Sequence, residues 1–158
     1  MKSFRKKIVI SKEPLDLTRF NLQIQSSQGE NGASVIFTGC VRASKQDDGL
    51  IGMTLEHYPN MTESLLDEIL LQAEKRWQLS RVLVAHRVGY LTRGEPIVFV
   101  GTCARHRKEA FESAEFIMDY LKNKATFWKK EHFIEDGNTK ELWVESKQSD
   151  LETLKRWQ

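Results

Sequence analysis

Residues 97–133, IVFVGTCARHRKEAFESAEFIMDYLKNKATFWKKEHF, decide the fold predicted for this chain. Residues 97–104 form a nearly continuous apolar run, which is typical of a buried strand. Between 107 and 123, apolar side chains recur every three or four positions, and this period predicts an amphipathic helix. Residues 127–133 predict another strand. The centre of the fold is therefore a strand, a long helix and a second strand in direct succession.

The same patterns predict further elements on both sides of this stretch. Strands are predicted at 6–10, 33–41, 53–58, 81–88 and 140–145, and helices at 15–24, 61–77 and 149–157. Turns are predicted at 92–95 and at Asp136-Gly137-Asn138, a hairpin signal. Because several strands follow one another without a helix between them, we predict an α+β fold with packed helices and a mixed or largely antiparallel sheet. No repeat or linker divides the chain, so a single domain over 1–158 is expected, closed by the short helix at 149–157.

The helix predicted at 61–77 has a recognisable start. Asn60 stands at the expected N-cap position, and Glu63 follows three residues later. This spacing is close to a capping box, in which two side chains satisfy free amides of the first turn.

The composition is that of an ordinary soluble domain. The 158 residues include 24 Lys and Arg against 22 Asp and Glu, a formal charge of +2, which argues against a surface built for nucleic acid. No apolar run approaches the roughly 20 residues of a membrane span, and the short apolar run at 8–10 is too small for a signal peptide. Cys40 and Cys103 therefore predict reduced thiols in the cytoplasm.

Several kinds of site are unlikely from the residue spacing. The chain contains no glycine-rich phosphate-binding motif, and its four histidines are scattered, so neither a nucleotide cofactor nor a metal is expected. Either cysteine could act as a nucleophile beside a histidine. A buried structural thiol is the favoured interpretation, more strongly for Cys103 than for Cys40.

Positive charge gathers at three element ends. Residues 120–132 hold four lysines and one acid around Phe127 and Trp128, residues 105–107 read Arg-His-Arg at a strand-to-helix junction, and Arg42 ends a strand. Lys129 shares a predicted strand face with Phe127, where its ammonium could serve in proton transfer or anion binding. The junction at 105–107 offers free helix amides to an anion. Together these clusters indicate a site for an anionic substrate. An RNA-binding module that stacks bases on Phe127 and Trp128 is the alternative.

Eight short motifs in this order resemble the large, catalytic subunit of molybdopterin synthase, over about residues 6–145. They are Leu55-Glu56-His57-Tyr58-Pro59, Met61-Thr62-Glu63, His86-Arg87-Val88-Gly89, Gly94-Glu95, His106-Arg107, Ala110-Phe111, Phe116-Ile117-Met118-Asp119-Tyr120-Leu121-Lys122 and Phe127-Trp128-Lys129-Lys130-Glu131. The resemblance implies an α/β hammerhead-like fold with an additional subdomain.

The resemblance also implies an activity and its partners. The family converts cyclic pyranopterin monophosphate to molybdopterin by forming a dithiolene. The sulfur comes from the thiocarboxylated C-terminal glycine of a small ubiquitin-like subunit. Two large subunits form a central dimer, with one small subunit at each end of a heterotetramer. A scaffold that only binds the ubiquitin-like tail is a further alternative, although it would have no need of the matched lysines.

Carried over by position, Lys122 and Lys129 match the family's two key lysines. The matched pocket and substrate contacts are Arg42, His106, Arg107, Lys130 and Glu131. Two positions depart from the pattern. Cys40 stands where some relatives have lysine, and Thr126 replaces a proline that often precedes the Phe-Trp-Lys run.

The predicted helix separates two of these matched residues. Arg107 begins it and Lys122 lies near its end, and fifteen residues at about 1.5 Å each place them roughly 22 Å apart. One small substrate cannot bridge that distance within one chain. We therefore predict a composite pocket, with His106 and Arg107 supplied by the neighbouring large subunit.

Overall fold

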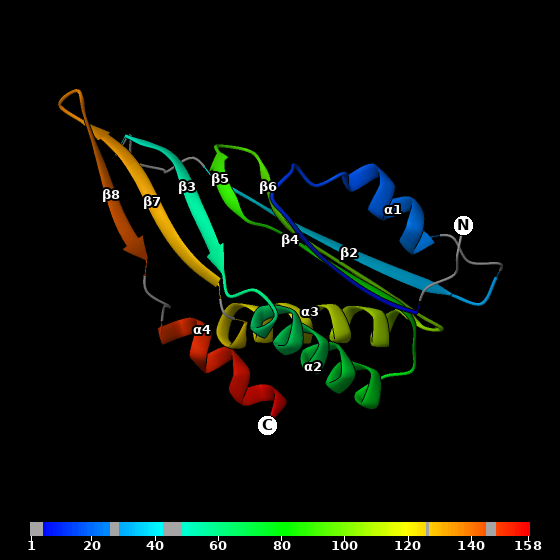
Figure 1. Ribbon diagram of the computed structural model, residues 1–158. Helices are drawn as coiled ribbons and strands as arrows, with labels where there is room; N and C mark the ends of the chain where they lie inside the picture. The colour runs from blue at the N-terminus through cyan, green and yellow to red at the C-terminus, as the bar shows by residue number, and fades with distance from the viewer. Residues whose placement is uncertain (1–4, 26–28, 43–48, 126, 145–147) are drawn as a thin grey trace.

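The computed structural model describes residues 5–25, 29–42, 49–125, 127–144 and 148–158 (Figure 1). The strands are β1 (Lys6–Ser11), β2 (Ala33–Cys40), β3 (Leu50–His57), β4 (Leu79–Arg87), β5 (Gly89–Thr92), β6 (Pro96–Ala104), β7 (Phe127–Glu135) and β8 (Asn138–Val144). The helices are α1 (Leu17–Gln25), α2 (Met61–Arg76), α3 (Arg107–Lys124) and α4 (Gln148–Thr153), followed by the 3-10 turn η1 (Leu154–Trp157). The predicted α+β class is confirmed.

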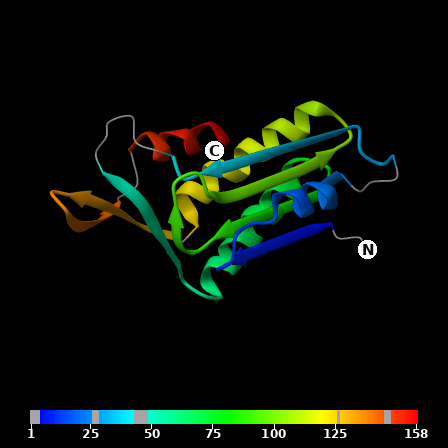
Figure 2. The same cartoon turned by 90° about the horizontal axis from the view of Figure 1, so that it is seen from above.

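The larger sheet has the strand order β1-β4-β6-β2. Only β1 and β4 run parallel, while β6 pairs antiparallel with both β4 and β2. Helices α2 and α3 cover one face and α1 covers the other (Figures 1 and 2). Because both faces are buried, β6 and the centre of β4 are apolar on both sides: Val82 and Val84 face α2 and α3, whereas Leu83 and Ala85 face α1.

The smaller sheet has the strand order β5-β3-β7-β8, with every pair antiparallel. Figure 1 shows it leaning away from the larger sheet beyond the end of α3. A small apolar cluster lies at its base, made by Val41, Met53, Leu55 and Leu91. The strands approach closely at Gly52, where a Cβ would lie 2.5 Å from the carbonyl oxygen of Leu91.

Strand β5 was not predicted from the sequence, which indicated only the turn that follows it. Four residues beginning with a glycine are too short to show an alternating pattern, and pairing with β3 supplies the order. The predicted strand at 53–58 begins earlier, at Leu50. The C-terminal helix is divided, with α4 ending at Thr153 and η1 continuing to Trp157.

The predicted capping box at the start of α2 is wrong. Asn60 has φ 70°, and its side chain makes no capping hydrogen bond. The buried Thr62 hydroxyl instead accepts from the Tyr58 amide at 3.0 Å. Glu63 is directed to His57, with 3.6 Å between its Oε1 and the histidine Nε2. The chain therefore enters α2 through a turn held from inside the helix.

The C-terminal segment packs against α2 and α3. The Trp157 ring meets Phe116 and Trp77 edge-on, at centroid distances of 5.4 and 5.8 Å. Asp119 accepts hydrogen bonds from Trp157 Nε1 at 2.7 Å and from Arg156 Nη2 at 2.8 Å. No helix in the described part of the chain is both long and apolar enough to cross a membrane.

Candidate functional site

Lys122 and Lys129 lie on either side of the junction between α3 and β7. Lys122 is exposed in the last turn of the helix. The backbone becomes extended at Ala125, with φ −71° and ψ 136°, and this ends α3. The Phe127 amide then donates to the Ala125 carbonyl at 3.0 Å as β7 begins. Lys122 thus lies three residues before Ala125, where the helix ends, and Lys129 lies four residues after it. Thr126, the proline replacement, falls outside the described residues.

Lys129 and Glu131 share the face of β7 that turns toward the apolar cluster. They pair in register with Leu55 and Met53 of β3, both members of that cluster. Lys129 is half-buried, and 3.9 Å separates its Nζ from Glu131 Oε1. Lys129 thus shares its strand face with Glu131 and Phe127, as the alternation of the predicted strand indicated.

Lys130 lies on the opposite face of β7, because side chains alternate along a strand. Its Nζ is 4.6 Å from the centre of the Trp143 ring and 3.3 Å from Glu141 Oε2. These contacts tie β7 to β8. The structure therefore separates Lys130 from Lys129 and Glu131, with which the sequence comparison grouped it.

Arg42 follows a residue that is firmly held. The Val41 amide donates to the Glu95 carbonyl at 2.9 Å, and the Val41 carbonyl accepts from the Gly94 amide at 2.7 Å. Val41 is fully buried in the same cluster as Leu55 and Met53. Exposed Arg42 therefore follows directly on a residue packed against β3, the strand that pairs with β7.

His106 and Arg107 lie at the other end of the molecule from this group. Both are exposed, and His106 is the N-cap residue of α3, with no capping hydrogen bond from its side chain. Helix α3 is continuous from Arg107 to Lys124, as Figure 1 shows. Its rise of about 1.5 Å per residue separates Arg107 from Lys122 by roughly 22 Å. Within one chain, the structure does not bring the two groups together.

Two buried polar residues at the end of β4 were not predicted as functional. The His86 ring stacks on Phe127, with centroids 3.7 Å apart and planes 13° apart. Its Nδ1 donates to the Arg87 carbonyl at 2.8 Å. Burial lowers the pKa of His86 to about 4, so the ring is neutral at pH 7. The Arg87 side chain is buried beside it. The sequence offered two signals: a histidine and an arginine at positions where the strand pattern expects apolar residues, and their place in one of the motifs that carry the family resemblance.

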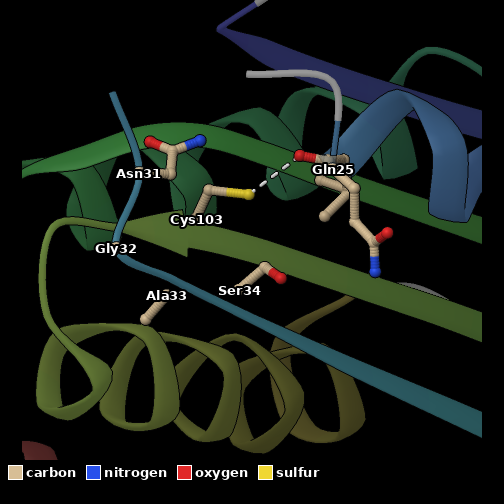
Figure 3. A pocket seen from close by; sticks show the side chains of 7 residues that line it. Gln25, Asn31, Gly32, Ala33, Ser34 and Cys103 are labelled. Carbon is tan, nitrogen blue, oxygen red and sulfur yellow. Dashed lines mark hydrogen bonds between the residues drawn. The ribbon is translucent and has the colours of Figure 1, made fainter. Parts of the chain in front are cut away.

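A separate cavity of about 160 Å³ lies beside Cys103, under the end of α1 (Figure 3). Its lining residues are Ile24, Gln25, Asn31, Gly32, Ala33, Ser34 and Cys103. The Cys103 thiol donates to the Ile24 carbonyl at 3.1 Å, and burial raises its pKa to about 11. A protonated, hydrogen-bonded thiol is a poor nucleophile, which supports the structural interpretation of Cys103. None of the candidate lysines lines this cavity.

No cluster of three or more His, Cys, Asp or Glu side chains suited to a metal ion occurs within the described ranges. The candidate charged residues on or next to the smaller sheet are Lys129 and Glu131 on β7, Arg42 after the cluster residue Val41, and Lys122 in the last turn of α3. Such a group can bind an anion and stabilise negative charge that develops during a reaction.

Comparisons with known proteins identify the family of the chain. The family model described as "MoaE protein" matches residues 10–124. The molybdopterin synthase catalytic subunit of Yersinia pestis is 54% identical over 128 residues, 81% of this chain and 82% of the relative. The subunit of the same name from Escherichia coli K12 is 46% identical over 151 residues, 96% of this chain and 97% of the relative.

A solved structure shows the same fold. The molybdopterin cofactor biosynthesis protein E from Burkholderia multivorans superposes with a TM-score of 0.79 at 37% identity, covering 98% of this chain and 97% of its own. Sequence and fold therefore agree over almost the whole length, and this chain belongs to the MoaE protein family.

Proposed function

We propose that this chain is the catalytic subunit of a molybdopterin synthase. It would convert cyclic pyranopterin monophosphate to molybdopterin with sulfur from the thiocarboxylated C-terminus of a small ubiquitin-like subunit. One observation carries the proposal: Lys122 and Lys129 flank the α3–β7 junction in a chain that is 46% identical to a molybdopterin synthase catalytic subunit over 151 residues.

The charge of the site suits both reactants. The pterin precursor carries a phosphate and the sulfur donor is a thiocarboxylate, so both are anions. Arginine and lysine side chains bind such groups through charge-assisted hydrogen bonds. Arg42 would hold the precursor, and Glu131 would orient the Lys129 ammonium, 3.9 Å away.

The two lysines would divide the chemistry between them. Lys122, exposed at the helix end, would meet the tail of the small subunit and aid sulfur transfer by moving a proton or stabilising the acyl intermediate. Lys129, half-buried beside the apolar cluster, would do acid–base or electrostatic work at the pterin. Lys130 faces the other side of the sheet, so we assign it to holding the β7–β8 hairpin.

His106 and Arg107 would complete the pocket from a second copy of the chain. The roughly 22 Å between the ends of α3 is the support for this arrangement. The family's central dimer of large subunits would then be required for catalysis.

We place the protein in the cytoplasm. Cys40 and Cys103 are both free thiols, and Cys40 is exposed. Exposed free thiols are typical of a reducing compartment.

A single-turnover assay tests the proposed function. The chain is mixed with a thiocarboxylated small subunit and cyclic pyranopterin monophosphate, and molybdopterin is measured over time. We expect product from the wild type, and a rate at least about 100-fold lower in Lys122→Ala and in Lys129→Ala.

Lys124→Ala is the matched control, because Lys124 is an exposed lysine in the same helix turn as Lys122. It should keep the wild-type rate. No product from the wild type with an active small subunit would overturn the proposed function. Wild-type rates in both alanine variants would overturn only the assignment of the two lysines.

A further inference from the structure

The His86-Arg87 pair ends β4 in the interior of the molecule, and the proposed chemistry does not use it. Both side chains are buried, at 5% and 7% exposure. A buried guanidinium is costly unless it is well paired, and an apolar residue would fill the space at lower cost. A role other than core filling therefore has to explain the pair.

We propose that His86 and Arg87 are positioning residues for the sulfur-transfer pocket, His86 for the two lysines and Arg87 for Arg42. This inference rests on the proposed function and adds to it. Neither side chain is assigned a contact with the reactants. His86 acts through its contact with Phe127, and Arg87 acts through its contact with Glu95.

His86 acts through Phe127. Their rings stack almost in parallel, with centroids 3.7 Å apart. The contact joins the second-last residue of β4 in the larger sheet to the first residue of β7 in the smaller one. Phe127 stands five residues after Lys122 and two before Lys129, on the same face as Lys129. The stack is therefore placed to hold both lysines at once.

The ring orientation of His86 is itself determined. The hydrogen bond from Nδ1 to the Arg87 carbonyl, 2.8 Å long, holds the imidazole in one plane. The neighbouring titratable groups are His57, which pairs in register with Phe127, and Glu63, 3.6 Å from His57. A hydrogen-bonded ring at this position presents a flat surface, and the Phe127 ring lies against it with planes 13° apart.

Arg87 acts through Glu95. Its Nη1 donates to the Val88 carbonyl at 2.7 Å, and its Nη2 lies 3.7 Å from Glu95 Oε1. The other Glu95 carboxylate oxygen accepts from the Thr92 amide at 2.6 Å. The Glu95 carbonyl accepts from the amide of Val41, the residue before Arg42. A continuous set of polar contacts thus runs from buried Arg87 to the backbone that presents Arg42.

The two residues should therefore affect different kinetic constants. Loss of a stack that aims catalytic lysines lowers the rate at saturating precursor, because small displacements of reacting groups are costly. Loss of a contact that aims a binding arginine raises the precursor concentration needed for half-maximal rate. A residue that only supports the core would lower the melting temperature and leave both constants of the folded protein unchanged.

The experiment uses the complete chain with thiocarboxylated small subunit and cyclic pyranopterin monophosphate. His86→Leu, which keeps the volume but removes the flat ring, should lower the saturated rate at least about tenfold, with half-saturation changed less than about twofold. His86→Phe, which keeps a flat ring, should recover to within about threefold of wild type. Arg87→Met should raise the half-saturating precursor concentration at least about tenfold, with the saturated rate changed less than about threefold.

Phe20→Ala is the matched control for lost core packing. Phe20 pairs with Phe99 at 5.5 Å in the core cluster under α1, which contains none of the candidate site residues. It should lower the melting temperature at least as much as His86→Leu and leave both kinetic constants unchanged.

A double-mutant cycle tests the stack from its other side. Phe127→Leu should reduce the saturated rate as much as His86→Leu does, and the double variant should fall no further than either single one. Because Phe127 is only half-buried, Phe127→Leu supplies this result even if His86→Leu fails to fold.

Other outcomes separate the two proposals. If the wild type forms molybdopterin while Phe127→Leu and Arg87→Met keep wild-type constants, the positioning role is wrong and the proposed function stands. Fully additive losses in the double variant would also overturn it. If the wild type forms no product with an active small subunit, the proposed function fails first.

Discussion

At the scale of single residues, His86 shows how burial sets chemical behaviour. Its ring lies between the two sheets, where water is excluded, and desolvation is the main reason why its pKa is lowered to about 4. The hydrogen bond from Nδ1 to the Arg87 carbonyl opposes this shift, and the nearby His57 adds to it. Stacking on Phe127 therefore involves a neutral imidazole across the physiological range.

This shift predicts an acid-sensitive stability. Below pH 6.5 the unfolded chain protonates this histidine, whereas the folded chain does not until about pH 4, so stability falls as pH decreases through that window. At pH 4.5 the loss should be on the order of 2–3 kcal/mol relative to pH 7.5. Urea unfolding of the wild type and of His86→Phe at both pH values measures it. Equal losses in the two proteins would contradict the assignment to His86.

At the scale of elements, the start of α2 depends on a residue inside the helix. Thr62 is fully buried and accepts from the Tyr58 amide, whereas Asn60 has a positive φ and makes no side-chain cap. A capping box read from sequence assumes that the cap residue has extended backbone. The tight turn from β3 into α2 imposes another conformation on Asn60, so the local motif is overridden.

Substitution should lower the free energy of unfolding much more at Thr62 than at Asn60. Thr62→Val keeps the shape but removes the hydroxyl that accepts from the part-buried Tyr58 amide, and should lower the free energy of unfolding by about 1 kcal/mol. Asn60→Gly should change it by less than about 0.5 kcal/mol, because glycine accepts φ 70° without strain. Urea unfolding of both variants at pH 7.5 checks the ranking. A larger loss in Asn60→Gly than in Thr62→Val would show that the Asn60 side chain caps α2 after all.

The length of an element decided whether the sequence pattern could predict it. The amphipathic period of α3 and the apolar run of β6 were read correctly, because each is long and repeats its signal many times. The four-residue β5 has no such repetition. Lys130 was matched to the family's substrate contacts by its position in the motif, which carries no information on where a side chain points. Adjacent residues of a strand point to opposite faces, so the structure places Lys130 and Lys129 on opposite faces of β7.

At the scale of the whole molecule, the two basic regions lie at opposite ends of α3. Lys122 is near the C-terminus of α3, Lys129 follows on β7 of the smaller sheet, and Arg42 follows the cluster residue Val41. Arg107 begins α3, just after the end of β6. A substrate that needs both regions requires a second chain. A two-fold dimer would supply the missing end to each pocket in the same way.

Hybrid dimers test this arrangement. Lys122→Ala and Arg107→Ala, each inactive alone, are mixed in equal amounts under conditions of proven subunit exchange. Half of the dimers would be hybrids with one intact pocket of two, so about a quarter of the wild-type activity should return.

A second mixture provides the control. Lys122→Ala mixed with Lys129→Ala should return no activity, because one chain supplies both lysines to the same pocket, at the α3–β7 junction, and every pocket would then lack one of them. Absence of rescue in the first mixture would show that the pocket is not shared between chains.

The sequence by itself determined the α+β class, the long helix α3, the two candidate lysines and the family, because periodicity and motif spacing are local properties of the chain. Only the tertiary structure decided that Arg42 follows a residue of the apolar cluster against which β7 pairs, that Lys130 lies on the opposite face of β7 from Lys129, and that His86 and Arg87 are buried. The physical reason is that these relations depend on strand register and on packing between the two sheets. Both arise from contacts between residues far apart in the chain, which no local pattern records.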